Sequence, residues 1–217
     1  MLIYKFLNEK YGLEALRMRR IKISRINELN DPFEFLAPKL SDYYLRKAFH
    51  KMKLQMLKNT GLLCFSKMRT NPLLWSHYAN RHQGICLGFN APKEDLKEVI
   101  YTSKRPNPEV FFSGSRTVKE EAMHKLIPTK YIHWKYEKEW RSWHRLEEKD
   151  PKTGHYFLDF SDRFNLVKVI VGAESKISRK TIDIALGKHR PNIECFQART
   201  AFNSFRIIQN KDSRLWK

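Results

Sequence analysis

The chain has 217 residues, with 42 Lys and Arg against 23 Asp and Glu, a formal net charge of +19, and an apolar content of 41%. This length fits one domain over residues 1–217 with a substantial core, and the apolar content excludes extensive disorder. There is no secretory signal and no apolar run of about 18 residues, so we expect a cytoplasmic protein without a membrane partner.

The excess positive charge is spread along the chain and indicates attraction to polyanions. A nucleic acid partner, RNA or DNA, explains it, and so does a surface that is simply rich in lysine.

Cys64, Cys86 and Cys195 form no Cys-x-x-Cys pair, which favours free thiols in a reducing compartment. The eight histidines are scattered and indicate no metal site.

The first sixty residues predict strands and helices in mixed order. We expect a strand over Leu2–Phe6, a helix over Gly12–Arg20, a strand over Ile21–Ile23 and a turn at Asn30–Pro32. Asp42 is typical of an N-cap. The helix that follows it has an apolar stripe of Leu45, Ala48, Phe49, Met52 and Met56. The basic residues off this stripe form either a solvated helix face or a stripe that binds polyanions; they are Arg46, Lys47, His50, Lys51, Lys53 and Lys58.

The rest of the chain is richer in predicted strands. Apolar runs at Leu62–Phe65 and Ile85–Phe89 predict buried strands, with a short helix over Pro72–Asn80 between them. Residues 101–128 read as loop-rich, with a short helix over Glu120–Leu126. A further helix is predicted over Ser178–Leu186, and further strands over Tyr131–Trp134, Glu139–His144, His155–Phe160, Val167–Val171 and Ser204–Ile208. Because the order shows no regular βαβ alternation, we expect an α+β fold with a mixed, largely antiparallel sheet and peripheral helices.

The segment Tyr136–Arg141 concentrates two carboxylates among aromatic and basic side chains. Strand alternation predicts Glu137, Glu139 and Arg141 on one face, with the aromatic and lysine residues between them on the other. A carboxylate beside a tryptophan is a candidate for catalysis. Pairing with Arg141 would instead make Glu139 structural, and both interpretations stay open.

Two other segments carry candidate site residues. In Trp75–Tyr78 the aromatic rings offer flat surfaces for a base or a nicotinamide, and Ser76, His77 and Tyr78 offer hydrogen bonds. The alternative is that Trp75 and Tyr78 are core aromatics of a short helix. The segment around the predicted turn adds Asn30, Asp31 and Glu34 as candidates, of which Asp31 is typical of a turn-former. Arg141, from the segment described above, is a further candidate.

Several of these segments, in this order, resemble the bacterial and phage family catalogued as domain of unknown function number 2971. The segments are Asn30–Glu34, Leu62–Ser66, Pro72–Phe89, Tyr136–Arg141 and Val167–Gly172, and the resemblance runs from Tyr4 to about Leu186. The layout is also similar to the ADP-ribosyltransferase superfamily of His-Tyr-Glu type, which implies two packed sheets and NAD as cofactor.

That second resemblance implies roles for individual residues. Tyr4 and Lys5 stand on the strand that contacts the NAD ribose, where Lys5 departs from the expected His. Trp75 or Tyr78, with its neighbours Ser76 and His77, stands where nicotinamide stacks. Glu139 stands where the catalytic Glu stabilises an oxocarbenium-like transition state. Strand alternation adds Glu137 on the same face, and such a pair is consistent with one acid orienting the substrate and the other activating the acceptor.

We therefore expect an NAD-dependent, ADP-ribosyltransferase-like enzyme that acts on nucleic acid or protein in a toxin or phage-defence setting. One alternative is a basic protein that binds or cleaves nucleic acid without a nucleotide cofactor, with affinity that falls steeply with salt. The other is a non-catalytic interaction module. No glycine-rich loop has Walker or Rossmann spacing, which argues against a standard nucleotide-binding fold.

Overall fold

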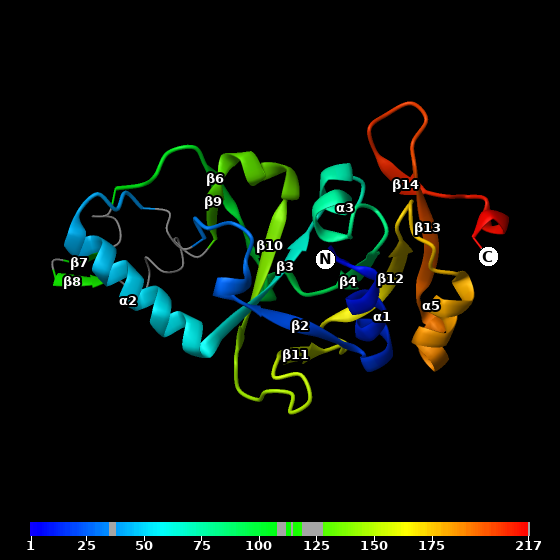
Figure 1. Cartoon of the computed structure of the whole chain (residues 1–217), viewed down its shortest axis with the longest axis horizontal. Helices are drawn as coiled ribbons and strands as arrows, with labels where there is room; N and C mark the ends of the chain where they lie inside the picture. The colour runs from blue at the N-terminus through cyan, green and yellow to red at the C-terminus, as the bar shows by residue number, and fades with distance from the viewer. Residues whose placement is uncertain (35–37, 108–111, 114, 119–127, 217) are drawn as a thin grey trace. The chain divides into compact units, whose positions relative to one another are not determined.

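The computed structural model describes residues 1–34, 38–107, 112–113, 115–118 and 128–216 (Figure 1). The chain divides into two compact units. Unit 1 comprises Met1–Lys22, Cys64–Asp95 and Phe157–Lys217, and unit 2 comprises Ile23–Leu63 and Leu96–Tyr156. A single domain over the whole chain stays a prediction, because one domain can contain two such units.

Unit 1 is built on sheet strands, one of which carries a continuous apolar run at residues 85–89. The strand order is β1 (Leu2–Leu7), β4 (Ile85–Asn90), β12 (Asn165–Val171), β13 (Glu194–Thr200) and β14 (Ile207–Gln209). Neighbours run antiparallel except β12 and β13, which are parallel. Residues 85–89 are all buried, which explains why this strand reads as a continuous apolar run rather than an alternating one.

Three helices accompany this sheet, and each begins at a side-chain cap. They are α1 (Glu9–Met18), α3 (Pro72–Tyr78) and α5 (Arg179–Leu186), capped by Asn8, Asn71 and Ser178. Helix α1 packs against α5 and β4, and α3 packs against β1. Short 3-10 helices lie at Lys93–Asp95, Gly187–Asn192 and Ser213–Leu215.

The turn after α3 has an unusual backbone. Asn80, Arg81 and His82 have φ of 45°, 52° and 68°, all in the left-handed region. The carbonyl of His82 accepts the amide of Glu174, and a Cβ added at Gly172 would lie 2.0 Å from the same oxygen. Only glycine at position 172 therefore allows this turn to close against the end of β12.

Unit 2 contains further strands and one long helix. Strand β3 (Thr60–Ser66) pairs with β2 (Arg20–Arg25) through Ser24–Leu62 and Arg25–Gly61, and also with β10 (Glu139–Arg145). β10 pairs in turn with β5 (Lys97–Glu98). Two smaller ladders are β6 (Ile100–Thr102) with β9 (Thr129–Tyr131), and β7 (Phe112–Ser113) with β8 (Ser115–Val118).

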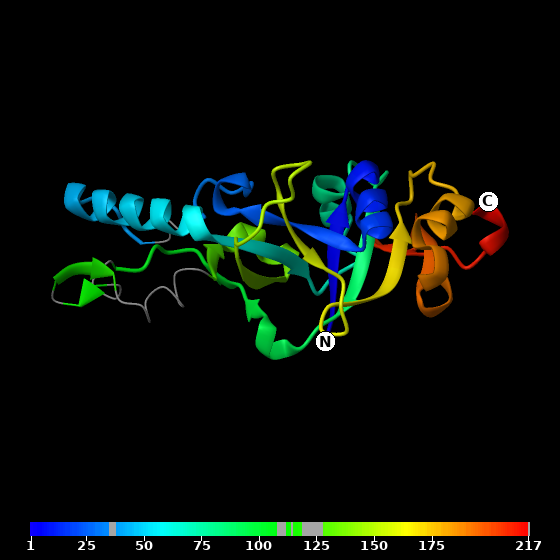
Figure 2. The ribbon, with the colours of Figure 1, turned by 90° about the horizontal axis from the view of Figure 1, so that it is seen from below.

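The long helix of unit 2 is α2 (Tyr43–Asn59), which lies beside β8 in both ribbon views (Figures 1 and 2). Asp42 caps its first turn by accepting the amide of Leu45, as predicted. In the predicted stripe, Phe49 is buried and Leu45, Ala48 and Met52 are partly buried, while the side chain of Met56 lies outside the description. The unit also contains 3-10 helices at Ile26–Glu28 and Ile132–Glu137, and β11 (Tyr156–Asp159) begins at its last residue.

The predicted fold class is confirmed: the sheet is mixed and mostly antiparallel, and helices accompany it. The predicted strand over Tyr131–Trp134 is wrong, because β9 ends at Tyr131 and a 3-10 helix begins at Ile132. The strand predicted over Ser204–Ile208 begins only at Ile207, since residues 201–206 form the turn of the β13–β14 hairpin. β13 itself was not predicted, and Glu120–Leu126 lies outside the described residues. No helix in the described part of the chain is long and apolar enough to cross a membrane.

Candidate functional site

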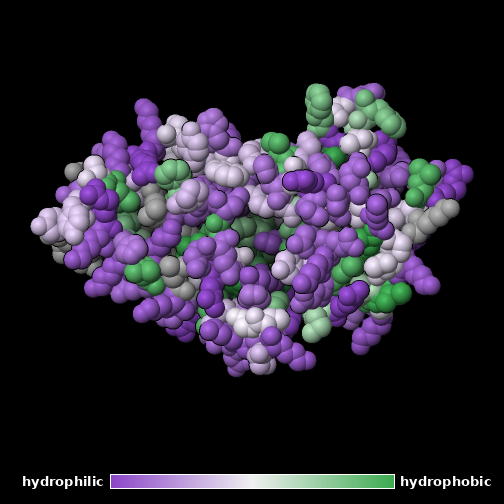
Figure 3. Space-filling model, in the orientation of Figure 1, coloured by the Kyte–Doolittle hydropathy of each residue, from purple (hydrophilic) through white to green (hydrophobic). Residues whose placement is uncertain are grey.

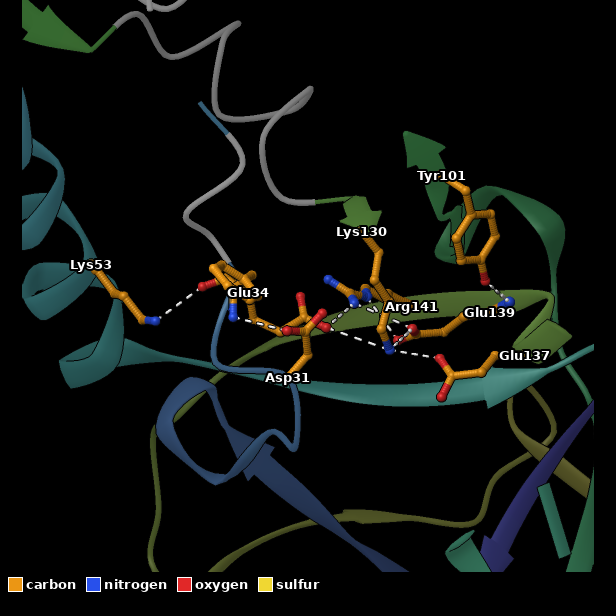
Figure 4. Close-up of polar contacts among 9 residues, drawn as sticks. Asp31, Glu34, Lys53, Tyr101, Lys130, Glu137, Glu139 and Arg141 are labelled. Carbon is orange, nitrogen blue, oxygen red and sulfur yellow. Dashed lines mark hydrogen bonds and ion pairs between the residues drawn. The ribbon is translucent and has the colours of Figure 1, made fainter. Parts of the chain in front are cut away.

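Five ionisable side chains are buried together in unit 2 (Figure 4). Glu34, Glu137 and Glu139 supply three carboxylates, and Lys130 and Arg141 supply two cations. All five are at most 6% exposed, and Arg141 is fully buried. They come from the turn after the 3-10 helix over Ile26–Glu28, from β9, from the end of the 3-10 helix over Ile132–Glu137, and from β10. We call this set the charge cluster.

Arg141 and Lys130 hold the cluster together from two sides. Arg141 donates from Nε to Oε1 of Glu139 at 2.8 Å, and from Nη2 to Oε1 of Glu34 at 2.7 Å. The ammonium of Lys130 donates to Oε2 of Glu137 at 2.6 Å and to Oε2 of Glu139 at 2.9 Å. Glu139 is therefore bound by both cations, through both of its oxygens.

The backbone explains how these groups meet, and it corrects one prediction. Glu139 and Arg141 share a face of β10, as strand alternation predicts. Glu137 is not on that strand: it ends a 3-10 helix, and Lys138 then turns the chain with φ of 45°. The carboxylate of Glu137 reaches the cluster through this left-handed turn rather than by strand alternation.

The cluster contains one more carboxylate than cations. Burial raises the pKa of the Glu34 carboxyl above its ordinary value, although the charges of Arg141 and Lys130 oppose the shift. The pKa of Lys130 is raised as well, because Glu139, Glu137 and Glu34 together outweigh the cost of burying its charge. The Oε2 atom of Glu34 accepts no hydrogen bond from the described residues. Proton uptake by Glu34 would leave the cluster neutral.

Neighbouring polar groups fix the edges of the cluster. Tyr101 accepts the backbone amide of Glu139 at 2.8 Å, and Lys53 of α2 donates to the backbone carbonyl of Glu34 at 3.0 Å. The buried Asp31 accepts the amide of Phe33 with its side chain, and its carbonyl accepts the amide of Glu34. Asp31 is thus a turn-former, as its sequence context indicates.

The remaining predicted site residues lie in unit 1, apart from Asn30, which is exposed in unit 2. Trp75 is 1% exposed, packs edge-on against Phe6, and donates its indole N–H to the carbonyl of Arg69. These contacts match the core alternative for Trp75. Tyr4 is buried, Lys5 and Tyr78 are partly exposed, and Ser76 and His77 are exposed. The transferase-like roles of these six residues stay predictions.

Unit 2 also has a pocket of about 590 Å³ that sequence patterns did not reveal. Four of its eight lining residues are cations, and none is acidic. The ring of Tyr156 lies 5.5 Å from the guanidinium of Arg25 and 6.0 Å from the ammonium of Lys149. The lining residues, which define the basic pocket, are Arg25, Asn27, Lys51, Leu54, Gln55, Lys58, Lys149 and Tyr156.

A family model described as a protein of unknown function (DUF2971) matches residues 74–142. The matched stretch includes Trp75–Tyr78 and all of the charge cluster except Glu34. No curated protein and no solved structure matches the chain. The match agrees with the resemblance seen in the sequence over that stretch, and it carries no activity with it.

The described residues include the three cysteines and the side chains that could ligate a metal ion. Burial raises the pKa of the Cys195 thiol to about 11 and raises that of Cys86 well above its ordinary value, so both stay protonated at neutral pH. Cys64, Cys86 and Cys195 form no disulfide bond within the described part of the chain. Among the residues that the structure describes, no group of three or more His, Cys, Asp or Glu side chains is placed to hold a metal ion.

The charge cluster predicts a large penalty when one cation is removed. Arg141→Met leaves Lys130 as the one cation of the charge cluster beside the buried Glu34 and Glu139, so we expect a loss of about 3–5 kcal/mol in the free energy of unfolding. Arg141→Lys keeps the charge but loses the forked contact, and should lose less. Urea unfolding followed by tryptophan fluorescence measures both.

Arg145→Met is the matched control, since Arg145 ends the same strand and is exposed. It should change the free energy of unfolding by no more than about 0.5 kcal/mol. An Arg141→Met variant as stable as this control would contradict the structural role given to the cluster.

Proposed function

We propose that the protein binds nucleic acid, and that the basic pocket of unit 2 contacts the phosphate backbone. The observation that carries the proposal is the lining of that pocket: four cations, no carboxylate and one tyrosine around about 590 Å³. Nucleic-acid sites combine positive side chains for phosphates with aromatic faces for bases. Asn27 and Gln55 add side-chain amides, which also contact phosphates and sugars.

Helix α2 supplies two of these cations, and its composition supports the proposal. Its 17 residues include five Lys or Arg and no Asp or Glu. An ordinary solvated helix face mixes both signs, because opposite charges four residues apart stabilise it. A helix that carries only positive charge loses this stabilisation, and a bound polyanion would supply it. Glu28 is the acid nearest in sequence to Arg25. Its carboxylate accepts the backbone amide of Arg25 and does not line the pocket.

The β13–β14 hairpin of unit 1 favours single-stranded over double-stranded nucleic acid. Phe202 and Phe205 in its turn are 87% and 98% exposed, and Figure 3 shows apolar side chains projecting where this hairpin ends. The guanidinium of Arg199 lies 4.4 Å from the Phe202 ring centroid, and residues 195–211 contain no acid. Exposed aromatic rings beside cations are the stacking platforms on which unpaired bases bind.

An NAD-dependent transferase stays a hypothesis of the sequence alone. Both oxygens of Glu139 are engaged by buried cations, so the charge cluster accounts for this carboxylate without catalysis. Transfer of label from NAD to RNA, DNA or lysate protein, abolished in Glu139→Gln, would revive the hypothesis. Labelling at equal levels by the variant and the parent would remove Glu139 from it.

The basic pocket predicts affinity that depends on salt and on two lysines of α2. For a labelled single-stranded oligonucleotide, the logarithm of the parent's association constant should fall linearly with the logarithm of the salt concentration. Lys51→Gln/Lys58→Gln should flatten that slope by about 0.7 for each lysine, since each phosphate contact releases counterions. Fluorescence anisotropy across a salt series measures both slopes.

The control for this experiment removes the same charge elsewhere. Lys93 and Lys188 are exposed in unit 1, so Lys93→Gln/Lys188→Gln lowers the net charge equally without touching the pocket. The control should keep the parent's slope. Equal flattening in both double variants would mean that only overall charge matters, and would contradict the pocket.

The hairpin predicts a difference between single and double strands. Phe202→Ala/Phe205→Ala should weaken binding of a single strand by about 1–3 kcal/mol for each base that loses its stacking partner. Binding of a duplex should stay unchanged, because its bases are already stacked. The same loss for both substrates, or no loss for either, would refute the stacking role.

A further inference from the structure

A second pocket in unit 2 has the chemistry of a nucleotide site. It has a volume of about 370 Å³. It lies between the segment at the end of β6 and the segment that forms β9. Its lining residues, which define the small pocket, are Phe33, Thr102, Ser103, Lys104, Arg105, Thr129, Lys130 and Tyr131. None of them lines the basic pocket.

Two cations of the small pocket are placed to meet an anion. Lys104 and Arg105 are exposed, and neither forms an ion pair with a carboxylate of the described residues. The guanidinium of Arg105 lies 5.0 Å from the centroid of the Phe33 ring, and its Nη1 donates to the carbonyl of Pro38 at 3.4 Å. A guanidinium backed by a ring is held in place while its other N–H groups stay available to a phosphate.

Aromatic surface is available in the same pocket. Phe33 is 54% exposed and Tyr131 is 47% exposed, which is a large fraction for side chains of this size. The Tyr131 ring lies 4.9 Å from that of His133, so it is supported on one side. The hydroxyl of Thr102 accepts the amide of Lys104, which fixes the backbone beside the cations.

The wall of the small pocket is held by the charge cluster. Lys130 contributes to the lining, yet its ammonium is bound by Glu137 and Glu139 and lies 4.8 Å from the Trp134 ring centroid. Because its ammonium is bound in the charge cluster, Lys130 forms part of the pocket wall rather than a charge that can move to meet a ligand. The same bonds hold β9, the strand that carries Lys130, in place. A rigid wall with cations and aromatic faces at the rim suits a planar ligand that ends in an anion.

We propose that the small pocket binds a nucleoside monophosphate, with the phosphate on Lys104 and Arg105 and the base against Tyr131 and Phe33. A pocket of about 370 Å³ is at the lower end of the range for small-molecule sites, which matches one nucleotide and excludes a folded partner. Phosphate alone would use only the cations, and a nucleoside alone only the rings. The site is independent of the basic pocket and does not require that the protein bind nucleic acid.

Isothermal titration with AMP tests this proposal. AMP should bind at one site, while inorganic phosphate and adenosine should each bind at least tenfold more weakly, since each makes only part of the contacts. Arg105→Gln should weaken AMP binding about tenfold. Tyr131→Ala should weaken AMP binding but leave phosphate binding unchanged. Lys135→Gln is the control, because this exposed lysine does not line the pocket, and it should bind AMP as the parent does.

Three results would overturn the site: no saturable AMP binding by the parent, phosphate binding as tight as AMP, or equal losses in Arg105→Gln and Lys135→Gln. The Lys51→Gln/Lys58→Gln variant separates this inference from the proposed function. It should bind AMP like the parent even though its affinity for single strands is reduced. Loss of AMP binding in that variant would place the nucleotide in the basic pocket and refute the small one.

Discussion

Burial of Glu34, Glu137 and Glu139 with Lys130 and Arg141 is the constraint on which unit 2 depends. Ionised groups withdrawn from water are tolerated only when they are paired and hydrogen-bonded. This requirement fixes β9 and β10 to each other and to the turn at residues 31–34. Through the bond from Lys53 to the carbonyl of Glu34 it also fixes α2, which carries part of the basic pocket.

The cluster also changes how the composition should be understood. Four carboxylates are buried in the described residues, including Asp31, against two buried cations. Acidic residues are already scarce in this chain, so removing four of them from the surface leaves the exposed charge more positive than the sequence count suggests. The same ion pairs that stabilise unit 2 therefore leave its surface favourable to anions. The ion pairs that stabilise unit 2 are in this way linked to the anion binding that we propose for its surface.

Local patterns predicted much of the fold and part of the cluster. Apolar runs and caps located most strands and helices, and strand alternation placed Glu139 and Arg141 on one face. The partner Lys130 could not be predicted, because nothing in its own sequence context indicates a pairing nine residues away. Glu137 was misplaced since Lys138 adopts a left-handed conformation that sequence rarely signals for lysine. Phe205 falls within the strand predicted over Ser204–Ile208, yet it is exposed in a turn. Both pockets combine segments that are distant in sequence.

Photo-crosslinking of a bound single-stranded oligonucleotide, followed by mass spectrometry of the linked peptides, tests the central claim most directly. We predict crosslinks in the peptides that contain Arg25 and Asn27, Lys51 to Lys58, and Lys149 to Tyr156, because these line one pocket. Crosslinks that avoid all three peptides, in a complex that nonetheless forms, would contradict it.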